Sequence, residues 1–218
     1  MAGALGAAGR KVALIERSSM MYGGTCINVG CIPTKSLVYR AGLTMARGGD
    51  FKDKADAYRE AMAQKDSLTA KLRKKNYDKL DSNPNITVLD GTASFVSPHV
   101  VEVVNGGERY EVEGKMIFIN TGSSAFVPPI EGLKDNPYVY TSEGLLSRRE
   151  LPEKLVIIGG GYIGVEFSSI YASFGSEVTI LQDGDIFLPR EDAEIAGEVK
   201  KSLEARGIRV LTGVRTKA

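Results

Sequence analysis

An alternation of apolar strands and helical patterns in the last third of the chain constrains its fold most strongly. Lys154–Ile158 has the branched apolar composition of a buried strand, and it is followed by a glycine turn and a helical pattern over Ile163–Phe174. A strand over Glu177–Leu181, a helix over Asp192–Ala205 and a strand over Ile208–Leu211 continue the series. This order predicts a parallel sheet in an α/β fold.

The turn after the first of these strands reads GGGYIG and fits the pattern G-x-G-x-x-G. Between a strand and a helix, this pattern favours a dinucleotide site over an ordinary tight turn, which is the alternative. Gly159 and Gly161 would let the backbone turn sharply and approach a pyrophosphate. Gly164 would let the helix pack closely, and the helix N-terminus would attract the phosphates.

The residue expected to bind the adenine ribose lies about 20 positions after the first glycine. Counting along the chain reaches Gln182, with Asp183 beside it. A glutamine can hydrogen-bond a ribose hydroxyl, and no arginine is present there to receive a 2′-phosphate. The sequence therefore favours NADH over NADPH.

A first nucleotide-binding unit is indicated near the start of the chain. Lys11–Glu16 reads as a buried strand, and Glu16 closes it as a ribose-binding acid would. The matching glycine turn would lie about 20 residues upstream, before Met1. The opening MAGALGAAGR resembles the back half of the helix that follows such a turn. We therefore expect the chain to begin inside a nucleotide-binding fold.

The spacing of apolar residues changes twice in the middle of the chain. A helix is predicted over Ser36–Met45, and one long or two shorter amphipathic helices over residues 51–80. From Ile86 to Ile119 the apolar period falls towards two, which predicts a small antiparallel sheet. Prolines and glycines between residues 128 and 137 predict a connection that leads away from it.

Both cysteines of the chain lie in the stretch MYGGTCINVGCIPTK. On a regular helix, Cys26 and Cys31 would be roughly 8.6 Å apart between their Cα atoms, whereas a disulfide usually needs less than about 6.8 Å. A bond between them would therefore require a local distortion, and Gly30 is where the backbone could supply it. A small, strained ring of this kind would be easy to reduce, as a catalytic disulfide should be.

Three other interpretations of the cysteine pair are open: inert thiols, half of a metal site, or a structural bridge. A zinc site needs about four ligands, and the one histidine, His99, lies in a Ser-Pro turn of the predicted sheet, so no metal site is expected. A structural bridge across so small a loop would stabilise little.

Composition excludes several classes of partner. The net charge of +1 gives no support for nucleic-acid binding, and no apolar run is long enough for a membrane span. The opening residues do not have the pattern of a secretory signal. We therefore expect a cytoplasmic protein with a small-molecule substrate, in which two close cysteines are more often redox-active or metal-binding than structural.

The run GGTCINVGCIPTK resembles the redox motif of the class I pyridine nucleotide-disulfide oxidoreductases, the family of dihydrolipoamide dehydrogenase, glutathione reductase and mercuric reductase. VALIE, the FINTG turn that ends at Gly122 and GGGYIGVEF extend the resemblance along the chain. MYGGTCINVGCIPTKSLV and FLPRED are most similar to the mercuric-reductase-like branch that contains the bacterial reactive-chlorine-resistance flavoprotein.

The resemblance implies catalytic roles for four residues. Cys26 would be the interchange thiol that attacks substrate, and Cys31 the thiol that faces the flavin. Lys35 would lie beside the flavin ring and pair with Glu166, because a buried lysine needs such a partner. For Lys35 a solvated helix residue is the alternative. For Glu166 the alternative is an acid that suits the dipole of a first helical turn.

The family also implies a binding site for FAD and one for NAD(P)H. Tyr162 would cover the nicotinamide pocket, and Glu16 would hold the FAD adenosine ribose. The residues expected to contact either cofactor are Glu16, Gly23, Gly24, Thr25, Gly30, Lys35, Gly122, Gly159, Gly161, Tyr162, Gly164 and Gln182.

Several family features do not occur in this sequence. The first glycine turn, the second FAD segment and the C-terminal interface domain, which supplies the dimer contact, are missing. We therefore expect an FAD-binding domain over residues 1–145 and the N-terminal part of a NAD(P)-binding domain over 150–218, both incomplete.

The predicted function is that of an FAD-dependent NAD(P)H oxidoreductase, homodimeric at full length, that acts on a disulfide, an oxidant or a metal ion. The alternatives are a non-catalytic piece that at most binds a nucleotide, or half of a split enzyme.

Overall fold

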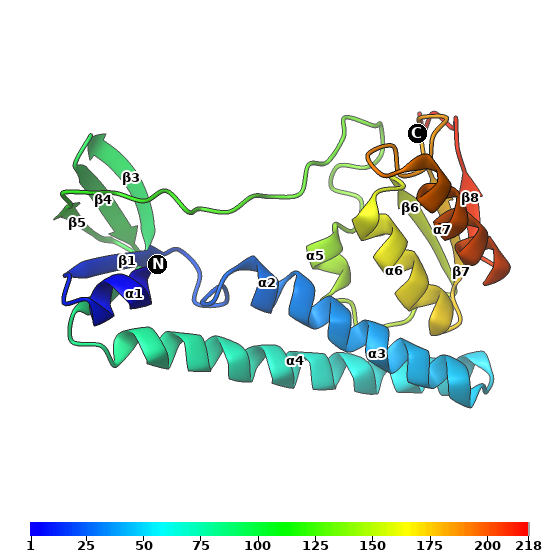
Figure 1. Ribbon diagram of the computed structural model, residues 1–218, viewed down its shortest axis with the longest axis horizontal. Helices are drawn as coiled ribbons and strands as arrows, with labels where there is room; N and C mark the ends of the chain where they lie inside the picture. Colours follow the sequence, from blue (N-terminus) through cyan, green and yellow to red (C-terminus); the bar gives the residue numbers. More distant parts are fainter. Residues whose placement is uncertain (218) are drawn as a thin grey trace. The chain divides into compact units, whose positions relative to one another are not determined.

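The computed structural model describes residues 1–217, which form two compact units (Figure 1). The first contains residues 1–30 and 68–123, and the second contains residues 31–67 and, within the described part of the chain, 124–217. Helix α4 (Phe51–Asp81) contributes its first part to the second unit and its last part to the first. The predicted α/β class is confirmed, whereas the division into an FAD-binding and a NAD(P)-binding domain concerns ligands and stays a prediction.

A two-stranded parallel sheet forms part of the first unit. Strand β1 (Val12–Glu16) pairs in register with β2 (Ile86–Asp90), and Glu16 lies opposite Asp90. Helix α1 (Ala2–Ala7) precedes β1, as the opening sequence predicted. The assignment of Ile86–Asp90 to the antiparallel sheet was wrong. Helices separate this segment from β1, and a crossover of that kind joins parallel strands.

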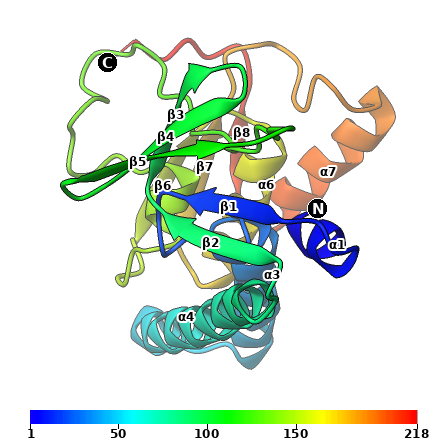
Figure 2. The same ribbon diagram turned by 90° about the vertical axis from the view of Figure 1, so that its left-hand side faces the viewer.

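The antiparallel sheet of the first unit has three strands, β3 (Thr92–Ser97), β4 (Val100–Asn105) and β5 (Glu108–Glu113), paired in that order (Figure 2). Val101 and Val103 of the central strand are buried. The sheet was predicted to extend to Ile119, but its last strand ends at Glu113 and residues 114–119 form no strand. Met116 and Ile119 are instead largely exposed, because an apolar run becomes a strand only where a neighbour pairs with it and covers it.

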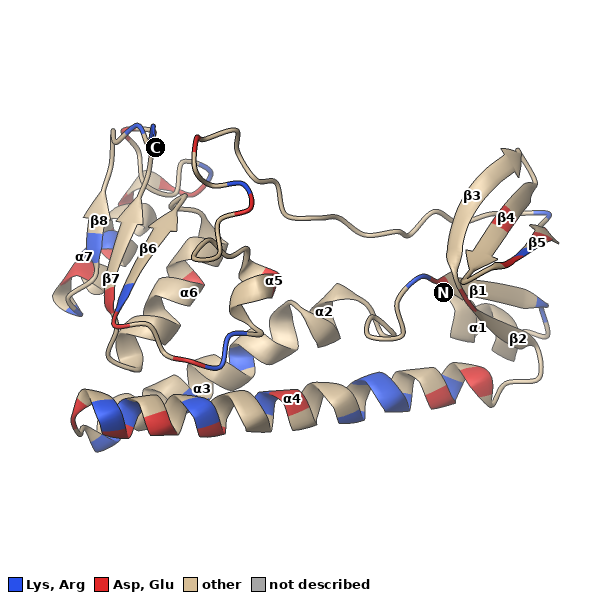
Figure 3. Ribbon diagram, turned by 180° about the vertical axis from the view of Figure 1, so that it is seen from behind, with Lys and Arg blue, Asp and Glu red and all other residues tan. Residues whose placement is uncertain are grey.

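The second unit contains a three-stranded parallel sheet in the order β6 (Lys154–Ile158), β7 (Glu177–Leu181), β8 (Arg209–Leu211). Helices α6 (Tyr162–Ser173) and α7 (Ala193–Ala205) connect these strands and cover one face of the sheet (Figures 1 and 3). The predicted parallel β-α-β-α-β order is confirmed. Asp192 caps α7 by accepting hydrogen bonds from the amides of Glu194 and Ile195, which stabilises the first turn.

Helix α3 (Cys31–Arg47) begins five residues before the predicted helix and belongs to the second unit. Pro33 falls in its first turn, where the amide that proline lacks would have no helical partner. Leu37 and Ala41 bury one face of α3 in the core of this unit, together with Met62 of α4 and Ile170 of α6.

Carbonyl groups at the end of the short helix α5 (Ser142–Leu145) and in the three residues after it accept hydrogen bonds from side chains of longer helices. The Tyr58 hydroxyl donates to the carbonyl of Arg148 over 2.9 Å, and Lys65 Nζ donates to that of Leu146 over 2.6 Å. The Tyr171 hydroxyl lies 2.9 Å from that of Tyr58 and reaches the carbonyl of Leu145 over 3.3 Å. These bonds tie the segment from Leu145 to Arg148 to helices α4 and α6.

Candidate functional site

The glycine turn between β6 and α6 has a backbone that other residues could not easily adopt. Gly159 has a φ of 104°, in the region that side chains disfavour. A Cβ on Gly164 would lie 2.4 Å from the carbonyl oxygen of Gly159 and 3.2 Å from Ile157 Cγ2. Gly164 is therefore required for the close packing of the helix on the strand and turn, as predicted.

Open space adjoins this turn where a pyrophosphate would bind. No atom lies within 4 Å of a Cβ built on Gly159 or on Gly161. Gly161 is the N-cap of α6 and makes no side-chain capping bond, so the first amides of the helix are available to a ligand. Tyr162, the first residue of the helix, is 76% exposed. These residues fit the phosphates of a dinucleotide.

Gln182 supports the turn directly. Its Oε1 atom accepts a hydrogen bond from the Gly160 amide over 2.8 Å, and its Nε2 atom donates to Asp183 Oδ1 over 3.3 Å. Sequence reasoning assigned Gln182 only to the ribose and missed this contact. The spacing of 22 residues gave a signal, because it places Gln182 directly after the strand that neighbours β6.

Lys35 and Glu166 form an ion pair within the second unit. Lys35 Nζ donates to Glu166 Oε1, and the side chains are 70% and 23% exposed. The predicted proximity of these two residues is confirmed, whereas the expected burial of Lys35 is wrong, because its side chain extends into solvent. Glu166 is the fifth residue of α6, so the alternative of an acid in the first helical turn is wrong.

The cysteine stretch breaks between two helices. Helix α2 (Thr25–Asn28) carries Cys26, and Cys31 begins α3. Both cysteine side chains are exposed. A Cβ on Gly30 would lie 3.0 Å from the carbonyl oxygen of Thr25 and 3.4 Å from Cys26 Cα. The helical path is thus interrupted at the glycine where the sequence predicted a distortion, whereas the redox role of the pair stays a prediction.

Residues predicted to contact FAD lie in two places within the first unit. Thr25 and Gly122 are neighbours, since a Cβ on Gly122 would lie 4.0 Å from Thr25 Oγ1. Gly24 is the N-cap of α2, and a Cβ on it would have no atom within 4 Å. Glu16 lies at the end of β1, where its carboxylate accepts a hydrogen bond from the Ser18 amide over 3.0 Å. The open space at Gly24 and the acid at the strand end fit a nucleotide cofactor, and no bond between Glu16 and Thr25 links the two places among the described residues.

Tyr22 anchors the start of the cysteine stretch, which sequence reasoning missed. It is 7% exposed, its hydroxyl donates to Asp90 Oδ1, and its ring packs edge-on against Tyr77 with 4.8 Å between centroids. Burial, and then the hydrogen bond to the Asp90 carboxylate, raises the pKa of Tyr22 well above its usual value. No local pattern signalled this contact, because Asp90 is 68 residues away along the chain.

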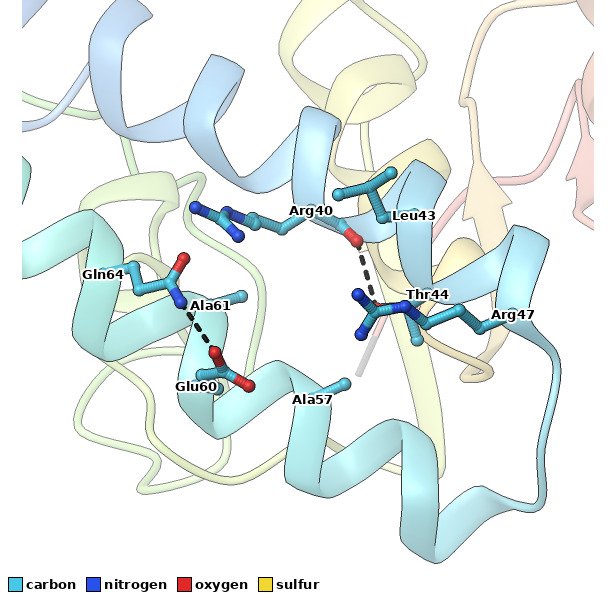
Figure 4. Close-up of a pocket in the computed structure, with 8 residues that line it drawn as sticks. All are labelled: Arg40, Leu43, Thr44, Arg47, Ala57, Glu60, Ala61 and Gln64. Carbon is cyan, nitrogen blue, oxygen red and sulfur yellow. Dashed lines mark hydrogen bonds between the residues drawn. The ribbon is translucent and has the colours of Figure 1, made fainter.

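A small cavity of about 50 Å³ lies between α3 and α4 in the second unit (Figure 4). Gln64 Nε2 donates to Glu60 Oε1 over 2.7 Å there, and Gln64 Oε1 is buried without a hydrogen-bond partner among the described residues. A cavity of this size admits water-sized molecules only. No predicted site residue lines it, since its lining consists of Arg40, Leu43, Thr44, Arg47, Ala57, Glu60, Ala61 and Gln64.

Two features are absent from the described residues. In that part of the chain, no helix is both long and apolar enough to cross a membrane. Within residues 1–217, no three or more His, Cys, Asp or Glu side chains gather as a metal ion would require.

Known proteins similar to this chain fall into one family. Residues 1–218 match the family model described as pyridine nucleotide-disulphide oxidoreductase. The chain is 47% identical over 207 residues to the probable pyridine nucleotide-disulfide oxidoreductase RclA of Escherichia coli strain K12, a match that covers 95% of this chain and 44% of that protein. It is 40% identical over 213 residues to a mercuric reductase of Acidithiobacillus ferrooxidans, which covers 93% of this chain and 38% of the relative.

A solved structure agrees with these matches. The Cu(II) complex of the HOCl-induced flavoprotein disulfide reductase RclA from Escherichia coli is 46% identical and has a TM-score of 0.91, over 99% of this chain and 46% of the other. The chain thus spans less than half the length of each of these three proteins. The family resemblance predicted from the redox motif is confirmed. Because the family model matches the whole sequence, the chain belongs to the pyridine nucleotide-disulphide oxidoreductase family.

Proposed function

We propose that this chain carries the redox centre of an FAD-dependent NAD(P)H oxidoreductase, in which electrons pass through Cys26 and Cys31 to a substrate. The observation that carries the proposal is the pair of exposed cysteines at a helix break, in a chain whose Lys35 and Glu166 form the ion pair that the redox motif implies. Membership of the family supports it further.

The cysteines would divide the chemistry between them. When bound, FAD would accept a hydride from the pyridine nucleotide and pass two electrons to the cysteine pair. The reduced Cys26 would attack substrate as its thiolate, which is the nucleophilic form of the side chain. Cys31 would face the flavin and would re-form the bond to Cys26 as the substrate leaves reduced.

Lys35 and Glu166 would support this exchange as a unit. The ammonium of Lys35 would lie by the flavin ring, where a positive charge favours the reduced, anionic form. Glu166 holds that ammonium through an ion pair, which fixes the direction of a long and otherwise flexible side chain. Glu16, Gly23, Gly24, Thr25, Gly30 and Gly122 would contact FAD.

The nucleotide would bind at the turn between β6 and α6. Gly159, Gly161 and Gly164 would shape the pyrophosphate site, and Tyr162 would cover the nicotinamide pocket until the nucleotide displaces it. Gln182 would face the ribose while it supports the turn. NADH is favoured over NADPH, because no arginine follows Gln182 in the segment Gln-Asp-Gly.

The substrate would be a disulfide, a reactive oxidant or a soft metal ion. The similar proteins point in two of these directions, since one is named a mercuric reductase and another is described as HOCl-induced and was solved with Cu(II). A homodimeric state and a cytoplasmic location are part of the same proposal for the whole protein. The rival proposal is a non-catalytic chain that at most binds a nucleotide, or one half of a split enzyme.

A visible absorption spectrum of the purified chain, with FAD and then NADH added without oxygen, tests the proposal. We expect flavin bands that bleach with NADH, and a long-wavelength shoulder that Cys31→Ser abolishes and Cys26→Ser retains. A chain that binds no flavin, and whose two cysteines stay unlinked under oxidising conditions, would overturn it in favour of the non-catalytic alternative.

A further inference from the structure

Asn28 lies between the two cysteines in the sequence, and both the nitrogen and the oxygen of its side-chain amide make hydrogen bonds. Asn28 Nδ2 donates to the carbonyl of Tyr22 over 3.0 Å and to that of Gly24 over 2.9 Å. These bonds close the turn that leads into α2, the helix that carries Cys26. The amide oxygen of Asn28 faces the other way and accepts a hydrogen bond from Arg73 Nε over 2.8 Å.

Arg73 belongs to one face of α4 that contacts the cysteine stretch repeatedly within the first unit. Its Nη1 atom lies 3.3 Å from Met20 Sδ. One turn further along the helix, the ring of Tyr77 packs on Tyr22, and Asn76 lies beneath Gly23, 3.4 Å from where a Cβ would be. Residues three and four positions apart share a face of a helix. This face therefore meets the stretch at Met20, Tyr22, Gly23 and Asn28.

We propose that Arg73 is a positioning residue for the redox pair, acting through Asn28, and this inference rests on the proposed function. The guanidinium is charged at every accessible pH, so its bond to the amide oxygen is charge-assisted. Through Asn28, the bond fixes the direction in which α2 leaves the turn and hence where Cys26 is held. Loss of the bond would leave the folded unit in place and let Cys26 move.

Movement of Cys26 would change the equilibrium between the two thiols and the disulfide, which can be measured. In exchange with glutathione, the two thiols of Cys26 and Cys31 give up two protons and two electrons to one oxidised glutathione. One sulfur–sulfur bond forms in the protein, one breaks in the glutathione, and two reduced glutathione molecules are released. The closer the two sulfurs are held, the larger is the equilibrium constant of this reaction, because closing the ring then costs less entropy.

The test is this equilibrium constant, measured in the 218-residue chain over a series of glutathione redox buffers, with trapped thiols counted by mass spectrometry. Arg73→Met keeps the length of the side chain and removes its donors. We expect it to lower the constant by up to about tenfold, because at most the energy of one hydrogen bond to a charged group is lost from the closed ring; tenfold corresponds to about 30 mV for a two-electron couple. Arg73→Lys, which retains a donor and the charge, should recover part of the loss.

Two controls separate positioning from general damage. Lys74→Met removes the neighbouring cation, which is 75% exposed and pairs with Asp78, and should leave the constant within twofold of the parent. Asn28→Ala should lower it at least as much as Arg73→Met does, because it also removes the two bonds to the carbonyls of Tyr22 and Gly24. The double variant should lose no more than Asn28→Ala alone, because Arg73 acts through Asn28. Should Arg73→Met fail to fold by circular dichroism, Asn28→Ala and Arg73→Lys decide the question.

The outcomes distinguish the two proposals. If the unaltered chain forms no disulfide in any buffer, the proposed function fails. If it does, but Arg73→Met and Asn28→Ala stay within twofold of it, or Lys74→Met falls equally, then the role of Arg73 is wrong while the proposed function stands.

Discussion

Two glycine-rich segments of this chain are held in different ways. The turn at residues 159–164 is shaped mainly by its own backbone, with one side-chain bond from Gln182. The stretch at residues 20–30 is held by side chains of distant segments, Arg73 and Tyr77 on α4 and Asp90 on β2. The geometry of the turn is determined by its local sequence, whereas that of the stretch at residues 20–30 forms only when the whole unit has folded.

The largest effect on stability should come from a change at Gly164, because the turn there is shaped by its own backbone. In Gly164→Ala the new Cβ would lie 2.4 Å from a backbone oxygen, and we expect a loss of about 3 kcal/mol in the free energy of unfolding, at the upper end of overpacking costs. Chemical denaturation measures it. Gly161→Ala is the matched control, because open space surrounds that position, and it should change stability by less than about 0.5 kcal/mol. Equal losses in both variants would contradict the backbone account.

Removal of the Tyr22 hydroxyl should test the side-chain account of the cysteine stretch. Tyr22→Phe removes the bond to the Asp90 carboxylate, and we expect a loss of about 1.5 kcal/mol at pH 8, typical of a hydrogen bond to a charged group. Denaturation curves measure the loss, and Tyr110→Phe on strand β5 serves as a control.

The Tyr22 contribution should also depend on pH. Because burial and the bond to Asp90 raise the folded-state pKa of Tyr22, the unfolded chain releases this proton first as the pH rises. The stability it contributes is therefore fully present below about pH 10, the ordinary tyrosine pKa, and is lost as the pH rises toward the folded-state pKa. The difference in the free energy of unfolding between the parent and Tyr22→Phe should become smaller above pH 10. A difference that grows there would contradict a raised folded-state pKa of Tyr22.

A smaller effect on stability is expected at Gln182, which supports the glycine turn between β6 and α6. Gln182→Ala leaves the Gly160 amide without its acceptor, and we expect a loss of about 1 kcal/mol. Gln182→Glu keeps an acceptor and should be close to the parent in stability. Thermal unfolding distinguishes the two, and similar losses for both would mean that the bond does not hold the turn.

The smallest effect on stability should come from the Lys35–Glu166 pair. Lys35 is 70% exposed, and an exposed ion pair contributes about 0.5 kcal/mol or less. Lys35→Met and Glu166→Gln should therefore unfold almost as the parent does, although the proposed function gives the pair a role beside the flavin. A double-mutant cycle with a coupling above about 1 kcal/mol would show that the pair has a structural role instead.

The two segments also differ in how well the sequence predicted them. Strands β6 and β7 have the predicted bounds, because each is a short apolar run between turn signals. The burial predicted for β6 was wrong, since Val156 and Ile158 are exposed. The proximity of Lys35 to Glu166 followed from the motif resemblance and not from spacing. The parallel pairing of β2 and the exposure of Met116 were missed, since both depend on which neighbour is available to a strand.

The long-range supports of the cysteine stretch could not be predicted at all. Arg73 and Asn28 are 45 residues apart, and neither a charge pattern nor a period in α4 distinguishes Arg73 from the lysines beside it. Contacts of this kind are decided by the packing of a helix face, which a single sequence does not specify.

Helix α5 shows how such distant contacts affect the order of folding. A helix of four residues cannot persist alone in water. The carbonyls of Leu146 and Arg148, just after α5, accept hydrogen bonds from Lys65 and Tyr58, side chains 81 and 90 residues away, and the carbonyl of Leu145 accepts one from Tyr171 of α6. The amides of α5 can gain protection from hydrogen exchange only when α4 and α6 are already in place, so opening of the second unit and loss of α5 should be a single event. Residues 142–145 are therefore a natural reporter of cooperativity for that unit.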